Sequence, residues 1–373
     1  MHVHAKSFIV LLVGALALSV TSCEDDQAPS DVAPDGNLKK MPRPKEKKAL
    51  SQGDAGGEAP KTATPKKTPL PPQPHSTGPL RIATFNIENF NDAAGRVSGG
   101  QREGARTDEQ LGLLAQAIET TEADVMAVQE IVPTSINDFT SLIHTRVFNG
   151  RYTVLFGEGD ARLTTRQVIG IVYDPNKLTP IGTPKYFRFP KAQALHKHLA
   201  AAFETNDKRL KFAILGVHLK AGRKPEDQQT RLRQLAEIAT DFIPRMKSDF
   251  HTQNIVVLGD MNTTEYNQGI DGKLLYEHQF AQMNLTDLSS GLTCTAYSGV
   301  HGKYAPSFLD HILVNDSMRN RFQHVQAIAG GNCEAFNCED VEFSRENQQA
   351  LNQFRATWVA VSDHCPVTAI MQP

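Results

Sequence analysis

The sequence predicts an α/β fold for residues 79–373. Short runs of consecutive apolar residues, such as Ile255–Leu258, are typical of strands buried on both faces. Between such runs, longer segments such as Pro225–Arg245 carry apolar side chains at helical spacing. The region is large for one domain, but its length suits an α/β fold built on two sheets.

Strands and helices alternate along this region. The expected strands are Leu80–Phe85, Asp124–Val128, Val168–Tyr173, Leu210–Val217, Ile255–Leu258, Phe308–Val314 and Ser362–Val367, and the expected helices are Thr107–Thr120, Ile136–Val147 and Pro225–Arg245. Thr107 or Asp108 would cap the first helix, because both side chains can accept hydrogen bonds from the first turn. No internal repeat of solenoid length is present.

Residues 1–22 have the pattern of a secretory signal. A short polar segment with one lysine precedes an almost wholly apolar run from Phe8 to Val20, which is shorter than a comfortable membrane span. The run closes in Val20-Thr21-Ser22-Cys23, which resembles the bacterial lipoprotein signal. That resemblance implies cleavage before Cys23, acylation of its sulfur and new amino terminus, and a lipid-anchored protein on the periplasmic or cell-surface side of the envelope. Ordinary secretion with a free Cys23 is the alternative.

Residues 23–78 are predicted to be a disordered tether. The segment is rich in Pro, Lys, Gly, Thr and Ser and lacks apolar periodicity, so it cannot bury enough surface to offset its ordering entropy. Its lysine-rich run, 39–48, could contact anionic lipid or nucleic acid, but we interpret it as a solvated spacer.

The charge balance argues against bulk electrostatic clamping of long nucleic acid. Residues 1–78 hold 10 Lys+Arg and 8 Asp+Glu, which leaves 29 against 33 for residues 79–373, a formal charge of −4. A protein that grips nucleic acid by net charge is usually basic. Binding of nucleic acid would therefore need a local patch or a metal ion.

Polar side chains that can do chemistry stand at the ends of the predicted strands. They are Asn86, Glu130, His218, Asp260, Asn262, Asp310, Asp363 and His364. Each alone has an ordinary explanation, such as a cap, a surface acid, a turn or a buried core histidine. The repetition at strand ends favours a shared site on a rigid scaffold. Oxygen ligands without cysteine or a close histidine pair suit Mg²⁺, or Mn²⁺, better than Zn²⁺.

Several other enzyme classes lack support. The sequence contains no glycine-rich phosphate loop, no Gly-x-Ser-x-Gly elbow and no His-Glu-x-x-His helix, which are the patterns of NTPases, serine hydrolases and zinc peptidases.

The ordered set of motifs resembles the endonuclease/exonuclease/phosphatase superfamily, which includes pancreatic-type deoxyribonucleases, AP endonucleases, sphingomyelinases and inositol phosphatases. The motifs are Thr84-Phe85-Asn86, Gln129-Glu130, His218 after an apolar strand, Gly259-Asp260-Met261-Asn262, Leu309-Asp310-His311 and Ser362-Asp363-His364. The resemblance implies a four-layer α/β/β/α sandwich of two facing mixed sheets flanked by helices. It also implies a Mg²⁺-dependent phosphoric ester hydrolase with its active site at one edge of the sheets.

The resemblance also implies roles for the motif residues. Glu130 would be the principal metal ligand, with Asn86 and Asp363 close to the metal and its waters. Asp260 would orient or deprotonate the attacking water, and Asn262 would hold the phosphate or that water.

The remaining roles concern the histidines. His364 would meet the scissile phosphate, and Asp310 would fix its tautomer and raise its pKa. His218 would contact a non-bridging oxygen or serve the leaving group. His311 is interpreted as structural, because alternation along a strand points it away from Asp310.

Departures from the subfamilies narrow the substrate only in part. His218 replaces the tyrosine usual in AP endonucleases, and the Leu309–His311 motif lacks the run typical of inositol polyphosphate 5-phosphatases. The candidate phosphate contacts are basic residues near expected rim loops: Arg166, Lys220, Arg223 and Arg231.

Three functions stay open: a nuclease, expected to act as a monomer; a sphingomyelinase-like or other phospholipid or small phosphoester hydrolase; and a non-catalytic surface binding lipoprotein.

The five cysteines of an exported protein are candidates for disulfides. With Cys23 acylated, four remain. Cys333 and Cys338 flank a short polar loop and are the best candidate pair. Cys294 and Cys365 are expected as buried thiols, with a bond between them as an alternative.

Overall fold

The computed structural model describes residues 78–91, 96–97, 100–101, 104–157, 167–189, 198–266, 268–300, 302–344 and 346–373. The predicted signal, Cys23 and the predicted tether as far as residue 77 lie outside the described residues. No described helix combines the length and apolar character needed to cross a membrane.

The first large sheet has six strands. Their spatial order is β15 (His324–Ala329), β17 (Val367–Gln372), β1 (Leu80–Phe90), β4 (Val125–Ile131), β6 (Val168–Tyr173) and β5 (Thr153–Leu155). The pair β1–β4 is parallel and the other pairs are antiparallel, so the sheet is mixed. Its central strands are buried on both faces, as the apolar runs predicted.

The second large sheet also has six strands and is also mixed. Their order is β11 (Leu285–Asp287), β14 (Asp310–Asn315), β10 (Ile255–Asp260), β9 (Lys211–His218), β8 (His198–Thr205) and β7 (Leu178–Phe187). Here β9–β10 is the parallel pair. A shared core of buried residues joins the two sheets face to face, with Ile82 and Ala127 from the first and Ile214 and Leu258 from the second.

The two sheets approach each other closely at Gly216 on β9. A Cβ added at Gly216 would lie 2.9 Å from a side-chain methyl of Ile169 and 3.2 Å from the Cβ of Ala127. Glycine is therefore needed at this position, because a side chain would push the two sheets apart.

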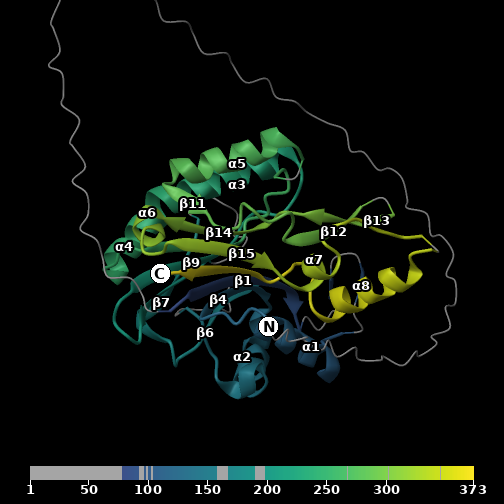
Figure 1. The fold of residues 1–373 in the computed structure, drawn as a ribbon, viewed down its shortest axis with the longest axis horizontal. Helices are drawn as coiled ribbons and strands as arrows, with labels where there is room; N and C mark the ends of the chain where they lie inside the picture. The colour runs from purple at the N-terminus through teal and green to yellow at the C-terminus, as the bar shows by residue number, and fades with distance from the viewer. Residues whose placement is uncertain are drawn as a thin grey trace, which may run out of the picture. The chain divides into compact units, whose positions relative to one another are not determined.

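Helices cover both outer faces, which makes the predicted four layers (Figure 1). The face of the first sheet is covered by α1 (Asp108–Glu119) and α2 (Ile136–Thr145), and the face of the second by α3 (Pro225–Glu237), α4 (Ile243–Phe250) and α5 (Ile270–Gln282). Thr107 caps α1 as predicted, with Gln110 completing a reciprocal capping box. The prediction of two large mixed sheets flanked by helices is confirmed.

The predicted helix over 225–245 runs on to Phe250 but contains a π-helical segment, Ile238–Phe242. Pro244 explains the irregularity, since it has no N–H to bond the carbonyl four residues earlier and its ring crowds that carbonyl. The Ile243 N–H bonds to the Ile238 carbonyl, five residues back.

A smaller cluster lies at one end of the sheets, and most of it escaped prediction. It contains the three-stranded sheet β12 (Ala296–Val300), β13 (Lys303–Ser307) and β16 (Val341–Glu342), with α7 (Gly331–Ala335) and α8 (Gln348–Ala360) beside it. The remaining short elements are β2 (Arg96–Val97), β3 (Gly100–Gln101), α6 (Asp316–Arg319) and the 3₁₀ turns Pro133–Ser135 and Val147–Gly150.

The predicted disulfide between Cys333 and Cys338 is wrong. The structure pairs Cys294 with Cys338 and Cys333 with Cys365, so neither Cys294 nor Cys365 is a free thiol. Sequence proximity misled the prediction, because the fold brings segments 32 and 44 residues apart to the same place.

Candidate active site

The polar ends of the second sheet lie side by side at one edge. Asp260 is the last residue of β10, and its register partners are His218 on parallel β9 and Asp310 on antiparallel β14. Because β14 runs antiparallel to β10, its first residue, Asp310, meets the last residue of β10. Gly259, with φ +143°, has no room for a side chain, since an added Cβ would lie 2.0 Å from the Val217 carbonyl oxygen.

Glu130 brings a carboxylate from the first sheet to the same edge. It has a left-handed backbone, φ 66°, at the point where the register of β4 shifts. Its Oε2 accepts hydrogen bonds from the backbone N–H of Asn89 at 3.0 Å and from Gln167 Nε2 at 2.8 Å. The side chain keeps 16% of its surface exposed. The carboxylate is thus held in one orientation while one side remains open to solvent.

Asn86 links the carboxylates of the two sheets. Its Nδ2 donates to Glu130 Oε1 and to Asp260 Oδ2, both at 3.0 Å. A carboxamide nitrogen has two hydrogens, so both are used. The Nε2 of His364 lies 3.5 Å from the same nitrogen and therefore receives no hydrogen from it.

His218 faces both carboxylates. Its Nε2 lies 3.4 Å from Asp260 Oδ2 and 3.7 Å from Glu130 Oε1. Behind it, its backbone N–H points at Nδ1 of the fully buried His198, 3.4 Å away. Burial, reinforced by the nearby His218, lowers the pKa of His198 to about 3, so the His198 ring is neutral at physiological pH.

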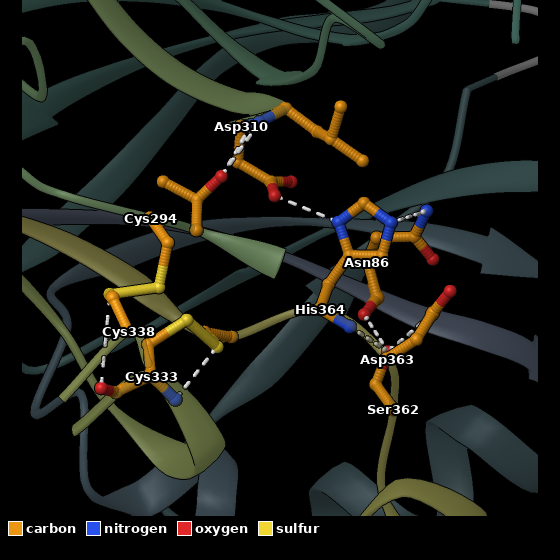
Figure 2. Close-up of a disulfide and its surroundings, with 11 residues drawn as sticks. Asn86, Cys294, Asp310, Cys333, Cys338, Ser362, Asp363 and His364 are labelled. Atoms are coloured by element: carbon orange, nitrogen blue, oxygen red, sulfur yellow. Dashed lines mark hydrogen bonds and ion pairs between the residues drawn. A yellow bond between two sulfur atoms is a disulfide. The ribbon is translucent and has the colours of Figure 1, made fainter. Parts of the chain in front are cut away.

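His364 and Asp310 form a buried pair (Figure 2). His364 Nδ1 lies 2.8 Å from Asp310 Oδ2, and His364 Nε2 lies 3.7 Å from Asp260 Oδ2. Burial alone would lower the pKa of His364, but the carboxylates of Asp310, Asp260 and Asp363 outweigh it and hold that pKa well above its usual value. The imidazolium form is favoured, with Nδ1–H directed at Asp310 and Nε2–H toward the site.

The segment before β17 carries Asp363 and His364 into place. Ser362 Oγ donates to the Asn86 carbonyl at 2.7 Å and accepts the His364 N–H at 3.1 Å. Asp363 Oδ1 lies 3.4 Å from the same hydroxyl, and its side chain is partly exposed. Figure 2 shows this segment beside Asn86. Its attachment to β1 aligns the histidine with the carboxylates.

Asn262 lies at the site, but it does not continue the strand that carries Asp260, so strand alternation does not set its direction. β10 ends at Asp260, and Asn262 has a left-handed backbone with φ 52°. Its N–H bonds to Asp260 Oδ1 at 2.8 Å, and its Nδ2 donates to the Leu219 carbonyl at 3.2 Å. The turn thus uses Asn262 to orient Asp260, and the Asn262 amide nitrogen is held by the neighbouring chain.

The four candidate phosphate contacts have different placements. Arg166 lies outside the described residues. Arg223 is exposed, whereas Lys220 forms an ion pair with Asp227 at 2.8 Å. For Arg231 the prediction is wrong, because its side chain is fully buried and cannot reach a substrate. The Arg231 guanidinium is held by Tyr276, Glu265, Thr264 and the carbonyls of Lys220 and Gly222.

His311 lies on the other face of β14, as alternation predicted for it. Its Nδ1 is 2.7 Å from Asp287 Oδ2, and its Nε2 is 2.7 Å from the Thr263 hydroxyl. The ring is fully buried among aromatic side chains, so both nitrogens bond to groups in the core.

Sequence reasoning missed several residues that support the site. Gln167 orients Glu130, and His198 backs His218. Buried Arg106 donates to the carbonyls of Ile87 and Val361, both at 2.7 Å, and so joins the end of β1 to the segment that carries His364. Gln167 directly precedes β6, and His198 begins β8, a strand that was not predicted. None of the three residues lies in a recognisable motif.

The donor set fits a hard divalent cation. The possible ligand atoms of three residues all lie within 4.8 Å of one another: those of Glu130, His218 and Asp260. None of these three residues is a cysteine. Carboxylate oxygens beside amide and imidazole groups suit a cation that keeps several waters and shares its remaining positions with phosphate. Glu130 would hold it, with Asn86 close to the cation and its waters. Asp363 is absent from this group and lies in the neighbouring segment.

Comparisons with known proteins agree with this geometry. Residues 83–364 match the model of the Endonuclease/Exonuclease/phosphatase family. An endonuclease/exonuclease/phosphatase structure from Bacteroides vulgatus is 16% identical, with a TM-score of 0.50 over 79% of this chain and 98% of that one. D. rerio TDP2, solved with a single-strand DNA product, is 14% identical, with a TM-score of 0.50 over 79% and 99%.

No curated protein sequence matches the chain significantly. The family match spans most of the chain and includes every strand end that forms the site. The chain belongs to the Endonuclease/Exonuclease/phosphatase family.

Proposed function

We propose that this protein is a divalent-metal-dependent phosphodiesterase that cleaves nucleic acid, with Mg²⁺ as its metal and Mn²⁺ as a substitute. The observation that carries the proposal is the single cluster in which Asn86 joins Glu130 to Asp260 and two histidines face the same Asp260 oxygen. A phosphodiester needs a group that readies water and groups that stabilise charge on the phosphoryl oxygens. The cluster offers both.

Asp260 is the group that readies the water. Its Oδ1 is fixed by the Asn262 N–H, while its Oδ2 accepts the Asn86 amide and faces both histidines. A carboxylate held in this way can orient a water molecule and accept its proton. The bound cation would supply charge neutralisation to the phosphate.

His364 acts as an electrostatic clamp. Asp310 keeps the His364 Nδ1–H oriented, and the favoured imidazolium form presents Nε2–H as a donor. A protonated imidazole cannot accept a proton, so it stabilises developing negative charge on a phosphoryl oxygen. His218 Nε2 faces the same Asp260 oxygen, and His218 serves a second phosphoryl oxygen or the leaving group.

Nucleic acid is the preferred substrate class. The formal charge of −4 over residues 79–373 argues against clamping by net positive charge, so recognition would rest on the metal site and on local cations such as the exposed Arg223. The fold shared with D. rerio TDP2 is compatible with a single-stranded product. We further propose that the protein is an exported monomer. The lipoprotein signal in the sequence would anchor it at the cell envelope through acylated Cys23 and the tether.

A substrate panel tests the proposal. The purified chain would be assayed with Mg²⁺ against plasmid DNA, RNA, sphingomyelin and bis-p-nitrophenyl phosphate. We expect cleavage of nucleic acid and of the small diester. Cleavage of sphingomyelin but not of nucleic acid would contradict the proposed substrate class and leave the proposed chemistry in place. Failure on all four, with metal bound, would favour a binding lipoprotein and overturn the proposal.

A further inference from the structure

Thr295 lies at the centre of a network behind the Asp310–His364 pair. The residue is fully buried next to Cys294. Its Oγ1 accepts the backbone N–H of Leu309 and that of Asp310, both at 2.9 Å. Its carbonyl accepts the N–H of Cys365 at 2.8 Å, directly after His364. One residue thus fixes the backbone beside both members of the pair.

The Thr295 hydroxyl also serves the Asp310 carboxylate. A threonine hydroxyl that accepts two amides still has its own hydrogen to donate. Oδ2 of Asp310 is taken by His364, and the buried Oδ1 has no hydrogen-bond partner among the described residues. Burial raises the pKa of Asp310, and His364 and the Thr295 hydroxyl both act against that rise. The hydroxyl therefore favours the ionised carboxylate that His364 needs as its partner, and it holds the Asp310 backbone through the two amides.

Two disulfides fasten the segments that meet at Thr295. The Cys294–Cys338 disulfide anchors the residue before Thr295, and the Cys333–Cys365 disulfide anchors the residue after His364 (Figure 2). Both lead to the same short region, since Cys333 lies within α7 and Cys338 follows the end of that helix by three residues. Backbone bonding adds to this: Ala296 bridges His364, and the Tyr297 N–H bonds to the Asp363 carbonyl at 2.9 Å.

We propose that Thr295 is a positioning residue for the Asp310–His364 pair, and that the two disulfides clamp it in place. The proposal deepens the proposed function and rests on it for its kinetic consequence. Small displacements of an oriented group cost rate rather than ground-state binding. Loss of the hydroxyl should therefore lower kcat and leave KM and metal affinity unchanged, because Thr295 contacts neither Glu130 nor Asn86 in the bonds that orient it.

The test compares Thr295→Val with Thr295→Ser. Valine keeps the shape and removes the hydroxyl, whereas serine keeps the hydroxyl. With bis-p-nitrophenyl phosphate, we expect kcat to fall about 10-fold or more in the valine variant and to be rescued in the serine variant. The matched control is Thr121→Val, which removes a buried hydroxyl bonded to the Ala123 N–H at the opposite end of β4. Its kcat should stay at the wild-type value.

A second readout does not depend on turnover. The His364 Nδ1–H proton should give a deshielded NMR resonance that is sharp in the wild type and in Thr295→Ser and broadened in Thr295→Val. If the wild type cleaves no phosphoester, the proposed function fails and this resonance alone decides the role of Thr295.

The outcomes separate cleanly. An unchanged kcat and an unchanged resonance in Thr295→Val would overturn the proposal. An equal loss in both variants would also overturn it, because the methyl group and not the hydroxyl would matter. Should Thr295→Val fail to fold, Cys294→Ala/Cys338→Ala keeps the hydroxyl and frees its segment. That variant should lower kcat and broaden the resonance, and wild-type values for both would contradict the clamp.

Discussion

Asn86 on the first sheet lies 3.0 Å from Asp260 on the second, with the Asn86 amide as donor to Asp260 Oδ2. The second hydrogen of the same amide goes to Glu130. A single side chain therefore ties together the carboxylate assigned to the metal and the carboxylate assigned to water. The relative position of the two sheets, set by their shared core, fixes the geometry of the site.

Asp260→Asn should abolish most activity with little change in fold. The substitution keeps the shape but removes the proton acceptor, and loss of a general base costs about 10²–10⁴-fold in rate. The measurement is kcat on bis-p-nitrophenyl phosphate, with circular dichroism to check folding. Asp241→Asn, in an exposed pair with Arg245, is the matched control. Near wild-type kcat in Asp260→Asn would remove Asp260 from the water-activating role.

Asp310→Asn should move the alkaline limb of the pH–rate profile to lower pH. The Asp310 carboxylate is the largest of the influences that raise the pKa of His364, so its loss lowers that pKa. If imidazolium is the working form, activity falls as pH rises through the pKa of His364, and a lower pKa brings that fall earlier. The measurement is kcat against pH for both proteins. A fixed alkaline limb with a shifted acid limb would make His364 the base.

Arg231→Met should lower stability, whereas Arg223→Met should weaken the binding of nucleic acid. Arg231 is buried with Glu265 as its partner, and removing one member of a buried pair costs roughly 3–5 kcal/mol, so chemical denaturation should show a large loss of stability. Arg223 is exposed, so its loss should leave stability within about 0.5 kcal/mol and raise KM for nucleic acid. A raised KM in folded Arg231→Met, with Arg223→Met normal, would reverse this assignment.

Cys23→Ala should release the protein from membranes. Acylation contributes about 0.8 kcal/mol for each buried CH₂, and the change removes the acylated sulfur. Fractionation of cells that express each form provides the measurement. A mutant that remains with the membrane fraction would contradict the lipoprotein signal at residues 20–23.

The sequence foretold the main sheets because their strands are buried on both faces and read as apolar runs. Val168–Tyr173 shows this, since the predicted and observed strands have the same bounds. Their polar ends were found for the same reason, because residues such as Asn86 and His218 are the first polar residues after such runs. Asp310 reaches the site although it begins its strand, because antiparallel pairing places the start of β14 beside Asp260.

The region around the disulfides could not be read in the same way. Cysteine connectivity depends on which distant segments meet, and spacing alone favoured Cys333 with Cys338. The α8 helix was missed although Leu351, Phe354 and Trp358 are buried at helical spacing, because polar residues separate them. Arg231 misled for another reason, since an arginine inside a polar helix gives no sign that its guanidinium is buried.

The central claim is that the strand-end cluster is a metal-dependent phosphodiester hydrolysis site. The most direct measurement is the rate of bis-p-nitrophenyl phosphate hydrolysis against Mg²⁺ concentration, after removal of metal with EDTA, for the wild type, Glu130→Gln and the control Glu122→Gln, whose carboxylate is exposed beside Arg81. We expect no rate in EDTA, recovery with Mg²⁺, and a Mg²⁺ requirement at least about 10- to 100-fold higher in Glu130→Gln alone. A rate that persists in EDTA, or an identical Mg²⁺ dependence in Glu130→Gln and wild type, would contradict the claim.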